Sequence, residues 1–146
     1  MIKKKTIILL FVLANLVSAS LLAAGETTAH FVRPGDLKTV GQGVKLYVDK
    51  EYVGKIWHDK YAVYKTNSGK HKILTKVGLS VGVPVTGLGG AKKFKTKVSL
   101  TDENHYFKIQ FKMGKMLLPG KHEVVEISKS EYESFKKNSS EIKYKD

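Results

Sequence analysis

Short stretches of alternating apolar and polar residues constrain the fold of this chain more than any other feature. Between residues 92 and 100, every second position suits a core, and these positions are Phe94, Thr96, Val98 and Leu100. Residues 106–113 repeat the pattern, with Phe107, Ile109, Phe111 and Met113 as the apolar set. Because successive side chains of a strand point to opposite faces, both segments are predicted to be strands with one buried face.

Five further segments have the composition or the alternation of strands, namely residues 44–48, 52–57, 60–66, 71–77 and 122–127. Turn-forming sequences separate them. Asp49-Lys50-Glu51 predicts a short hairpin between residues 44–48 and 52–57, and Asn67-Ser68-Gly69 predicts a turn in which Gly69 is suited to a positive φ. No helical segment intervenes, so we expect an antiparallel all-β domain. A small immunoglobulin-like β-sandwich of about seven strands fits this pattern.

The link between the two best-defined strands, residues 101–104, reads Thr-Asp-Glu-Asn and predicts a turn. If the flanking strands pair as a hairpin, Lys97 lies beside Lys108 and Lys93 beside Lys112. Like charges in opposite positions cost stability, so such a face must be hydrated or neutralised by a ligand.

The ends of the domain carry weaker signals. Residues 26–43 contain Pro34-Gly35-Asp36 and little periodicity, so we interpret them as a loose lead-in to a domain over residues 44–137. Ser130 and Glu133 fit a capping box, which predicts a short C-terminal helix with an apolar side formed by Tyr132 and Phe135. Residues 138–146 are polar, and we expect a frayed tail.

The first 25 residues have the composition of a signal peptide helix. A basic start through Lys5 precedes an apolar stretch and a segment rich in small residues, which predicts export and cleavage between residues 19 and 25. An uncleaved anchor is the alternative, although about 17 apolar residues are few for a hydrocarbon layer of roughly 30 Å. The chain has no cysteine, which excludes a lipid anchor on cysteine, disulfides and thiolate metal sites. We expect a periplasmic or secreted protein.

The charge of the chain is strongly positive. Lysine and arginine number 26 against 13 acidic residues, and loss of Lys3, Lys4 and Lys5 with the leader lowers the formal charge from +13 to +10. A basic exported domain favours polyanions such as lipopolysaccharide, teichoic acid or DNA, and the alternative is a lysine coat that only maintains solubility. The candidate polyanion-binding residues are Lys93, Lys95, Lys97, Lys108 and Lys112.

Residues 78–91 are apolar and glycine-rich, without a single charge. One interpretation is a loop that contacts a membrane or a partner protein, through Leu79, Val81, Val83, Val85 and Leu88. The other is a buried or edge β segment with bulges. Pro84 and the short length argue against a membrane-spanning helix.

Motifs of catalysis and metal binding are missing from the sequence. There is no phosphate-binding loop and no zinc-protease helix motif, and the five histidines are dispersed. Gly-Lys-His occurs at residues 69–71 and 120–122, where a paired metal or anion site and two ordinary strand entries are the alternatives. We expect no enzymatic activity and no cofactor.

Three short motifs lie between residues 44 and 77, namely Val48-Asp49, Val53-Gly54 and Ser68-Gly69-Lys70-His71. They resemble motifs of the PEGA-type β domains of bacterial exported proteins, although Lys50 and Ser68 replace the Gly and Pro usual in that family. Residues 102–107 are similar to a segment in a related family of exported bacterial proteins of unknown function. The resemblance implies a small envelope-associated β-sandwich without a known catalytic set. Together with the leader and the missing catalytic motifs, it leads us to expect an exported, non-enzymatic interaction or accessory module.

Overall fold

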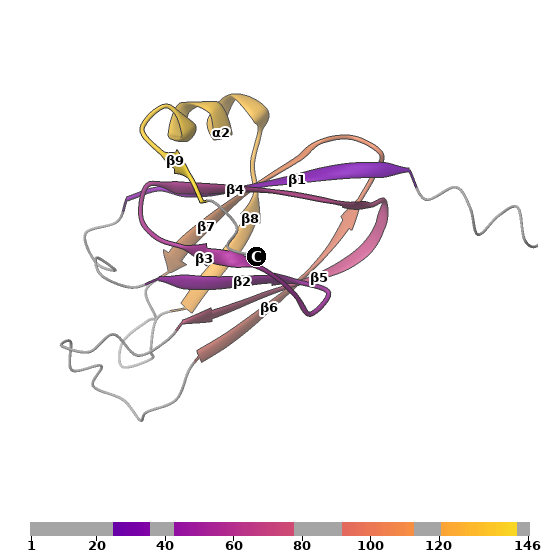
Figure 1. The fold of residues 1–146 in the computed structure, drawn as a ribbon, viewed down its shortest axis with the longest axis horizontal. Helices are drawn as coiled ribbons and strands as arrows, with labels where there is room; N and C mark the ends of the chain where they lie inside the picture. Colours follow the sequence, from indigo (N-terminus) through magenta and orange to yellow (C-terminus); the bar gives the residue numbers. More distant parts are fainter. Residues whose placement is uncertain (1–24, 36–42, 78–91, 113–120, 143–146) are drawn as a thin grey trace, which may run out of the picture.

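The computed structural model describes residues 25–35, 43–77, 92–112 and 121–142, which form two β-sheets and one short helix (Figure 1). One sheet has five strands in the order β8-β7-β1-β4-β9, and the other has four in the order β3-β2-β5-β6. The elements are β1 (Glu26–Arg33), β2 (Val44–Val48), β3 (Glu51–Ile56), β4 (Lys60–Asn67), β5 (Gly69–Val77), β6 (Lys92–Leu100), β7 (His105–Lys112), β8 (Lys121–Glu126), α2 (Lys129–Lys136) and β9 (Ser140–Glu141).

The predicted all-β class is confirmed, and each predicted strand occurs with ends displaced by at most two residues. The prediction of purely antiparallel pairing is wrong, because β1 pairs with β7 and β4 with β9 in parallel, and the described residues form nine strands instead of about seven. The first hairpin is also confirmed, because β2 and β3 pair across a two-residue turn at Asp49 and Lys50. Both turn residues have positive φ, 47° and 79°, as the tightest hairpin turns require. Gly69 likewise has a positive φ, of 138°. The predicted signal peptide lies, apart from Gly25, outside the described residues.

The prediction of a loose lead-in is wrong for residues 26–33. These residues form β1, which lies inside the five-stranded sheet, antiparallel to β4 and parallel to β7. Phe31 is fully buried and stacks on Phe107, with 5.3 Å between the ring centroids. The alternation of β1 is hard to recognise because two of its buried positions hold polar residues, Thr27 and Arg33.

The predicted pairing of residues 92–100 with residues 106–113 is also wrong. Strand β6 pairs with β5 along its whole length and belongs to the four-stranded sheet. Strand β7 belongs to the other sheet, where β1 and β8 occupy both of its edges. Residues 101–104 therefore connect the two sheets, and Lys97 and Lys93 do not lie beside Lys108 and Lys112.

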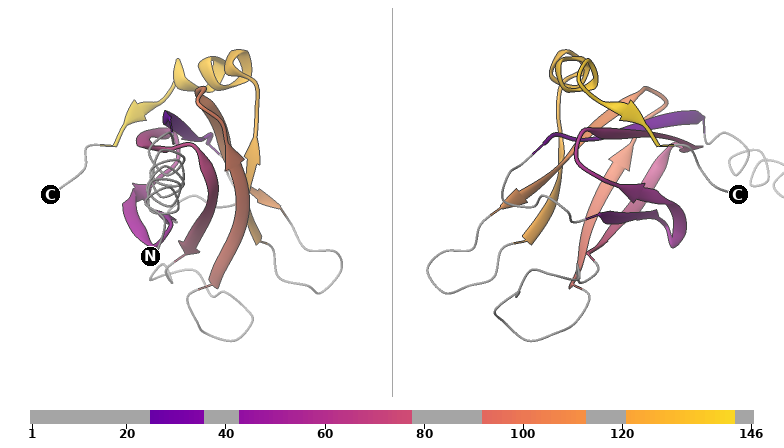
Figure 2. Two further views of the ribbon diagram at one scale, coloured as in Figure 1. Left: turned by 90° about the vertical axis from the view of Figure 1, so that its right-hand side faces the viewer. Right: turned by 60° about the vertical axis from the view of Figure 1, so that its left-hand side comes forward.

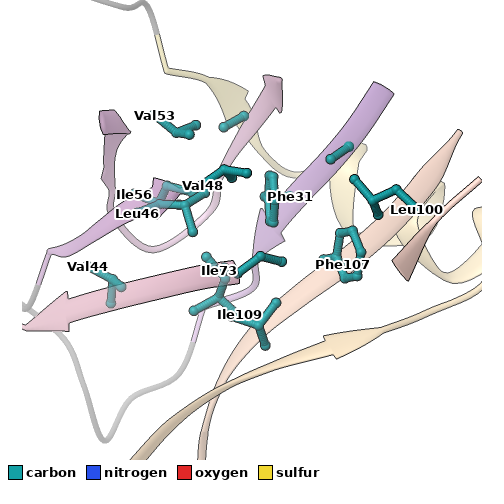
Figure 3. Close-up of a cluster of buried hydrophobic side chains, with 13 residues drawn as sticks. Phe31, Val44, Leu46, Val48, Val53, Ile56, Ile73, Leu100, Phe107 and Ile109 are labelled. Carbon is teal, nitrogen blue, oxygen red and sulfur yellow. The ribbon is translucent and has the colours of Figure 1, made fainter. Parts of the chain in front are cut away.

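The two sheets share one hydrophobic core (Figure 3). Phe31, Phe107 and Ile109 enter it from the five-stranded sheet, and Leu46 and Ile73 enter it from the four-stranded sheet. Each is at most 1% exposed, and burial of a side chain of this size contributes roughly 1.5–3 kcal/mol. The shared core fixes which face of each sheet remains outside.

Helix α2 covers part of the outer face of the five-stranded sheet, against β1 and β7 (Figure 2). Tyr132 is fully buried there and Phe135 is half-buried, which confirms the predicted apolar side. The helix is capped by Ser128 rather than Ser130, and the Ser128 hydroxyl accepts a hydrogen bond from the Glu131 amide at 3.2 Å. Ser128 and Glu131 have the same capping-box spacing as Ser130 and Glu133. Within the described ranges no helix is long and apolar enough to cross a membrane.

The expectation of a frayed tail is wrong for residues 140–142. Strand β9 pairs in parallel with β4, and the Ile142 side chain packs against the core. Two parallel pairs, Lys60 with Ser140 and Tyr61 with Glu141, hold the segment at the sheet edge. The strand is too short for a sequence pattern to reveal it.

Candidate functional site

The four-stranded sheet carries a row of lysines across its outer face. Register places Lys45 of β2 opposite Lys55 of β3 on one side and opposite Lys76 of β5 on the other. Lys76 in turn lies opposite Lys93 of β6. Adjacent strands are about 4.8 Å apart, so the backbone positions of four lysines form a row across the whole width of the sheet.

Further lysines share this outer face. Lys72 of β5 lies directly opposite Lys97 of β6, and Lys70 and Lys95 occupy outward positions of the same strands. We call the set the lysine face, and its eight members are Lys45, Lys55, Lys70, Lys72, Lys76, Lys93, Lys95 and Lys97. All are exposed except Lys76, which is half-buried.

Three aromatic side chains lie among these lysines. Tyr47 and Tyr52 are opposite each other on β2 and β3, with ring centroids 5.2 Å apart. Trp57 follows the end of β3, and the Lys55 ammonium lies 4.1 Å from its ring centroid. Lys76 makes the same kind of contact with Tyr47 at 4.2 Å. These distances fit cation–π attraction, so aromatic rings and cations form one mixed surface.

Two of these rings are unusually exposed. Tyr52 is 51% exposed and Trp57 is 40% exposed, and they are the large hydrophobic side chains exposed in the described part of the chain. Single exposed apolar residues are ordinary on a protein surface. Here both occur on one face, beside cations, which makes an aromatic and basic patch.

Acidic side chains neutralise little of the lysine face, where the Asp49 carboxylate at its edge attracts Lys72. Among the described residues, no carboxylate forms an ion pair with any of the eight lysines. Glu51 is the acidic residue of β3, but it does not belong to this face. It lies opposite the inward-facing Val48 and accepts a hydrogen bond from the Tyr64 hydroxyl of the other sheet at 2.6 Å. Like charges in opposite positions of a sheet are destabilising, so the bare face carries an energetic cost that a bound anion would offset.

Asp49, in the hairpin turn at the edge of this face, is engaged by other groups. Its carboxylate accepts a hydrogen bond from the Lys72 backbone amide at 2.8 Å and contacts Nδ1 of His71 at 2.6 Å. Partial desolvation raises the pKa of Asp49, but these hydrogen bonds, with the charge of Lys72 nearby, lower it below its usual value. The carboxylate therefore fixes the hairpin to β5.

The sequence-predicted lysines separate into two groups. Lys93, Lys95 and Lys97 belong to the lysine face, whereas Lys108 and Lys112 lie in β7 of the other sheet. There, Lys108 forms an ion pair with Glu131 of α2 at 2.8 Å, and Lys112 lies 3.8 Å from Glu123. The candidate set therefore loses the last two members and gains Lys45, Lys55, Lys70, Lys72 and Lys76 with Tyr47, Tyr52 and Trp57.

The two Gly-Lys-His motifs place their histidines in different sheets. His71 of β5 contacts the Asp49 carboxylate and, at 2.7 Å, the Asn67 carbonyl. His122 of β8 is buried beside the rings of Phe94 and Phe111. Over the described ranges no group of three or more His, Cys, Asp or Glu side chains is suited to a metal ion.

The glycine-rich segment, with Leu79, Val81, Val83, Val85 and Leu88, lies outside the described residues. Comparison with known proteins adds no further assignment, because no protein family, curated protein or solved structure matches the chain. The lysine face is therefore the functional candidate that the described residues offer.

Proposed function

We propose that this chain is an exported, non-enzymatic β-sandwich domain of the PEGA-like type that binds polyanionic polymers of the bacterial envelope or the extracellular space. The observation that carries the proposal is the lysine face, in which eight lysines on four adjacent strands have no carboxylate among their outward neighbours. The leader composition and the short motifs between residues 44 and 77 support the cellular location and the domain type.

The physical basis is the exchange of small counterions for a polymeric anion. Lysines that neutralise phosphates release condensed cations from the polymer, which drives association and makes it strongly dependent on salt. Binding would also remove the repulsion within the opposed pairs Lys76–Lys93 and Lys72–Lys97. Because the lysines lie on paired strands, the backbone beneath them is already ordered when the polymer binds, and only the lysine side chains lose conformational freedom.

The test compares three neutralised lysines on each sheet. The face variant combines Lys72→Gln, Lys95→Gln and Lys97→Gln, and the control combines Lys65→Gln, Lys112→Gln and Lys121→Gln. Both variants lose three charges, but the control lysines each lie within 4 Å of a carboxylate, at 3.7, 3.8 and 2.8 Å. The readout is the affinity for long-chain inorganic polyphosphate between roughly 50 and 200 mM salt.

We expect the wild-type affinity to fall steeply with salt. The face variant should flatten the logarithmic salt slope by about two to three units, since each phosphate contact contributes roughly 0.7–0.9. The control variant should change the slope much less. Equal losses in the two variants would show that overall charge, and not the lysine face, causes binding, and salt-independent binding would reject the proposal.

A further inference from the structure

We propose that the preferred polyanion is a single-stranded nucleic acid, whose phosphates contact the lysine face while its bases stack on Tyr52 and Trp57. This inference rests on the proposed function and makes it more specific. It starts from the two exposed rings, which a surface that bound only phosphate would not require. Binding of single strands by proteins commonly combines cations that follow the backbone with aromatic side chains on which bases stack.

The aromatic side chains are held in place for such a role. Tyr47 packs beside Tyr52 at 5.2 Å between ring centroids, and the Lys76 ammonium lies over Tyr47. The Lys55 ammonium lies over one face of Trp57. The rings of Tyr52 and Trp57 are therefore supported by neighbours from the sheet while 51% and 40% of their residue surface remains exposed.

Their spacing suits two different bases. Tyr52 is near the start of β3, and Trp57 is the residue after its end. Five residues of strand span roughly 16 Å, which is too far for both rings to sandwich one base. Strand β3 is also an edge strand of its sheet, so a chain can follow it without a second strand in the way.

The charge pattern agrees with a flexible strand lying on a sheet. Lys55 lies between the two rings in sequence, and the row Lys45, Lys76 and Lys93 continues from it across the sheet. A single strand exposes the flat faces of its bases, whereas a duplex keeps them stacked inside. Teichoic acid, lipopolysaccharide and polyphosphate carry phosphates without bases, so they would engage the lysines alone.

The single tryptophan of the chain makes the test direct, because Trp57 is the only source of tryptophan emission. The probes are a mixed-sequence single-stranded DNA of about 20 nucleotides, its duplex, an abasic strand of equal length, and a phosphorylated polysaccharide. We expect the single strand to bind at least tenfold more tightly than the abasic strand at equal salt, since one stacked base is worth about a factor of ten. Only the single strand should quench Trp57.

Two substitutions at one position separate the ring from the hydroxyl group. Tyr52→Leu should weaken single-strand binding roughly tenfold and leave binding of the abasic strand unchanged. Tyr52→Phe keeps the ring and should bind like the wild type. Both changes are on an exposed side chain, so the fold should persist, and the thermal unfolding midpoint checks this.

The outcomes distinguish this inference from the function on which it rests. Equal binding of the single and abasic strands, or no effect of Tyr52→Leu, would overturn the nucleic-acid inference and leave polyanion binding standing. Tighter binding of the duplex or of the phosphorylated polysaccharide would overturn it in favour of that ligand. Failure of every anion to bind in a salt-dependent manner would reject the proposed function itself.

Discussion

The outer faces of the two sheets both carry lysines, but the lysines have different neighbours. On the five-stranded sheet, helix α2 covers part of the face, and Lys108 and Lys112 lie beside Glu131 and Glu123. On the four-stranded sheet, no described element covers the lysine face, and its cations contact aromatic rings instead of carboxylates. Among the described residues, unpaired lysines are therefore concentrated on the four-stranded sheet.

The position of the acids explains this difference. The carboxylates that pair with lysines of the five-stranded sheet belong to β1, β8 and α2, which are part of that sheet or pack on it. Within the described residues of β2, β5 and β6 there is no acidic residue at all. The outward positions of these three strands thus hold lysines without interspersed acids, whereas charges of both signs serve solubility well.

The largest expected effect compares one tyrosine from each face. Tyr132→Ala should destabilise the protein by about 3–5 kcal/mol, because it empties a fully buried site between α2 and the rings of His30 and Tyr106. Tyr52→Ala on the lysine face should cost only about 0.5–1.5 kcal/mol, the value of its aromatic pair with Tyr47. Chemical denaturation of the two variants measures both values, and similar losses would show that the lysine face is also covered.

Alkaline pH should act on the same buried tyrosine. Burial, with negative charge nearby, raises the pKa of Tyr132 above its usual value. The folded state therefore resists ionisation, so stability is complete below about pH 10 and falls as the pH rises further, by at most about 1.4 kcal/mol per pH unit. Tyr132→Phe should remove the largest part of this fall. Tyr52→Phe should remove less, although burial raises the pKa of the half-exposed Tyr52 as well. Denaturation curves between pH 8 and 12 decide the question.

Alternation within a strand predicted most of the fold but not its pairing. Seven strands and the first hairpin follow from local patterns at particular residues, such as Phe94 to Leu100 against Lys93 to Ser99. Strand β1 was not predicted, because polar residues, Thr27 and Arg33, occupy two of its buried positions. If β1 is not recognised, β7 lacks a pairing partner on one side, and a hairpin between β6 and β7 is the simplest prediction.

The candidate site shows the same limit. Each lysine of β2, β3 and β5 is visible as a polar position of its strand, but only the strand order β3-β2-β5-β6 places it beside those of β6. Trp57 ends an apolar alternation and resembles a core residue in sequence, whereas it is 40% exposed. Which side chains become neighbours on a surface depends on pairing between strands that are distant in the sequence. Local alternation of apolar and polar residues does not reveal that pairing.

Substitutions at Lys50 in the hairpin turn separate two sources of instability in the four-stranded sheet, namely unfavourable backbone conformation and repulsion between charges. Lys50 has φ of 79°, a conformation that costs a residue with a side chain about 1 kcal/mol relative to glycine. Lys50→Gly should therefore stabilise the protein by about 1 kcal/mol. Lys50→Gln removes the charge and keeps the backbone strain, so it should have little effect. Equal gains in both variants would assign the strain to charge.

The smallest changes in stability that we expect have opposite signs on the two sheets. Lys108→Gln should cost about 0.5–1 kcal/mol, because it breaks the half-buried ion pair with Glu131. Lys97→Gln should instead stabilise the protein by a few tenths of a kcal/mol, since it removes the repulsion with Lys72 directly opposite. Denaturation at low and high salt checks both, because salt screening should shrink the two effects towards zero. If Lys97→Gln destabilises the fold, the lysine contributes a contact within the protein, and the argument that repulsion on this face favours a ligand fails.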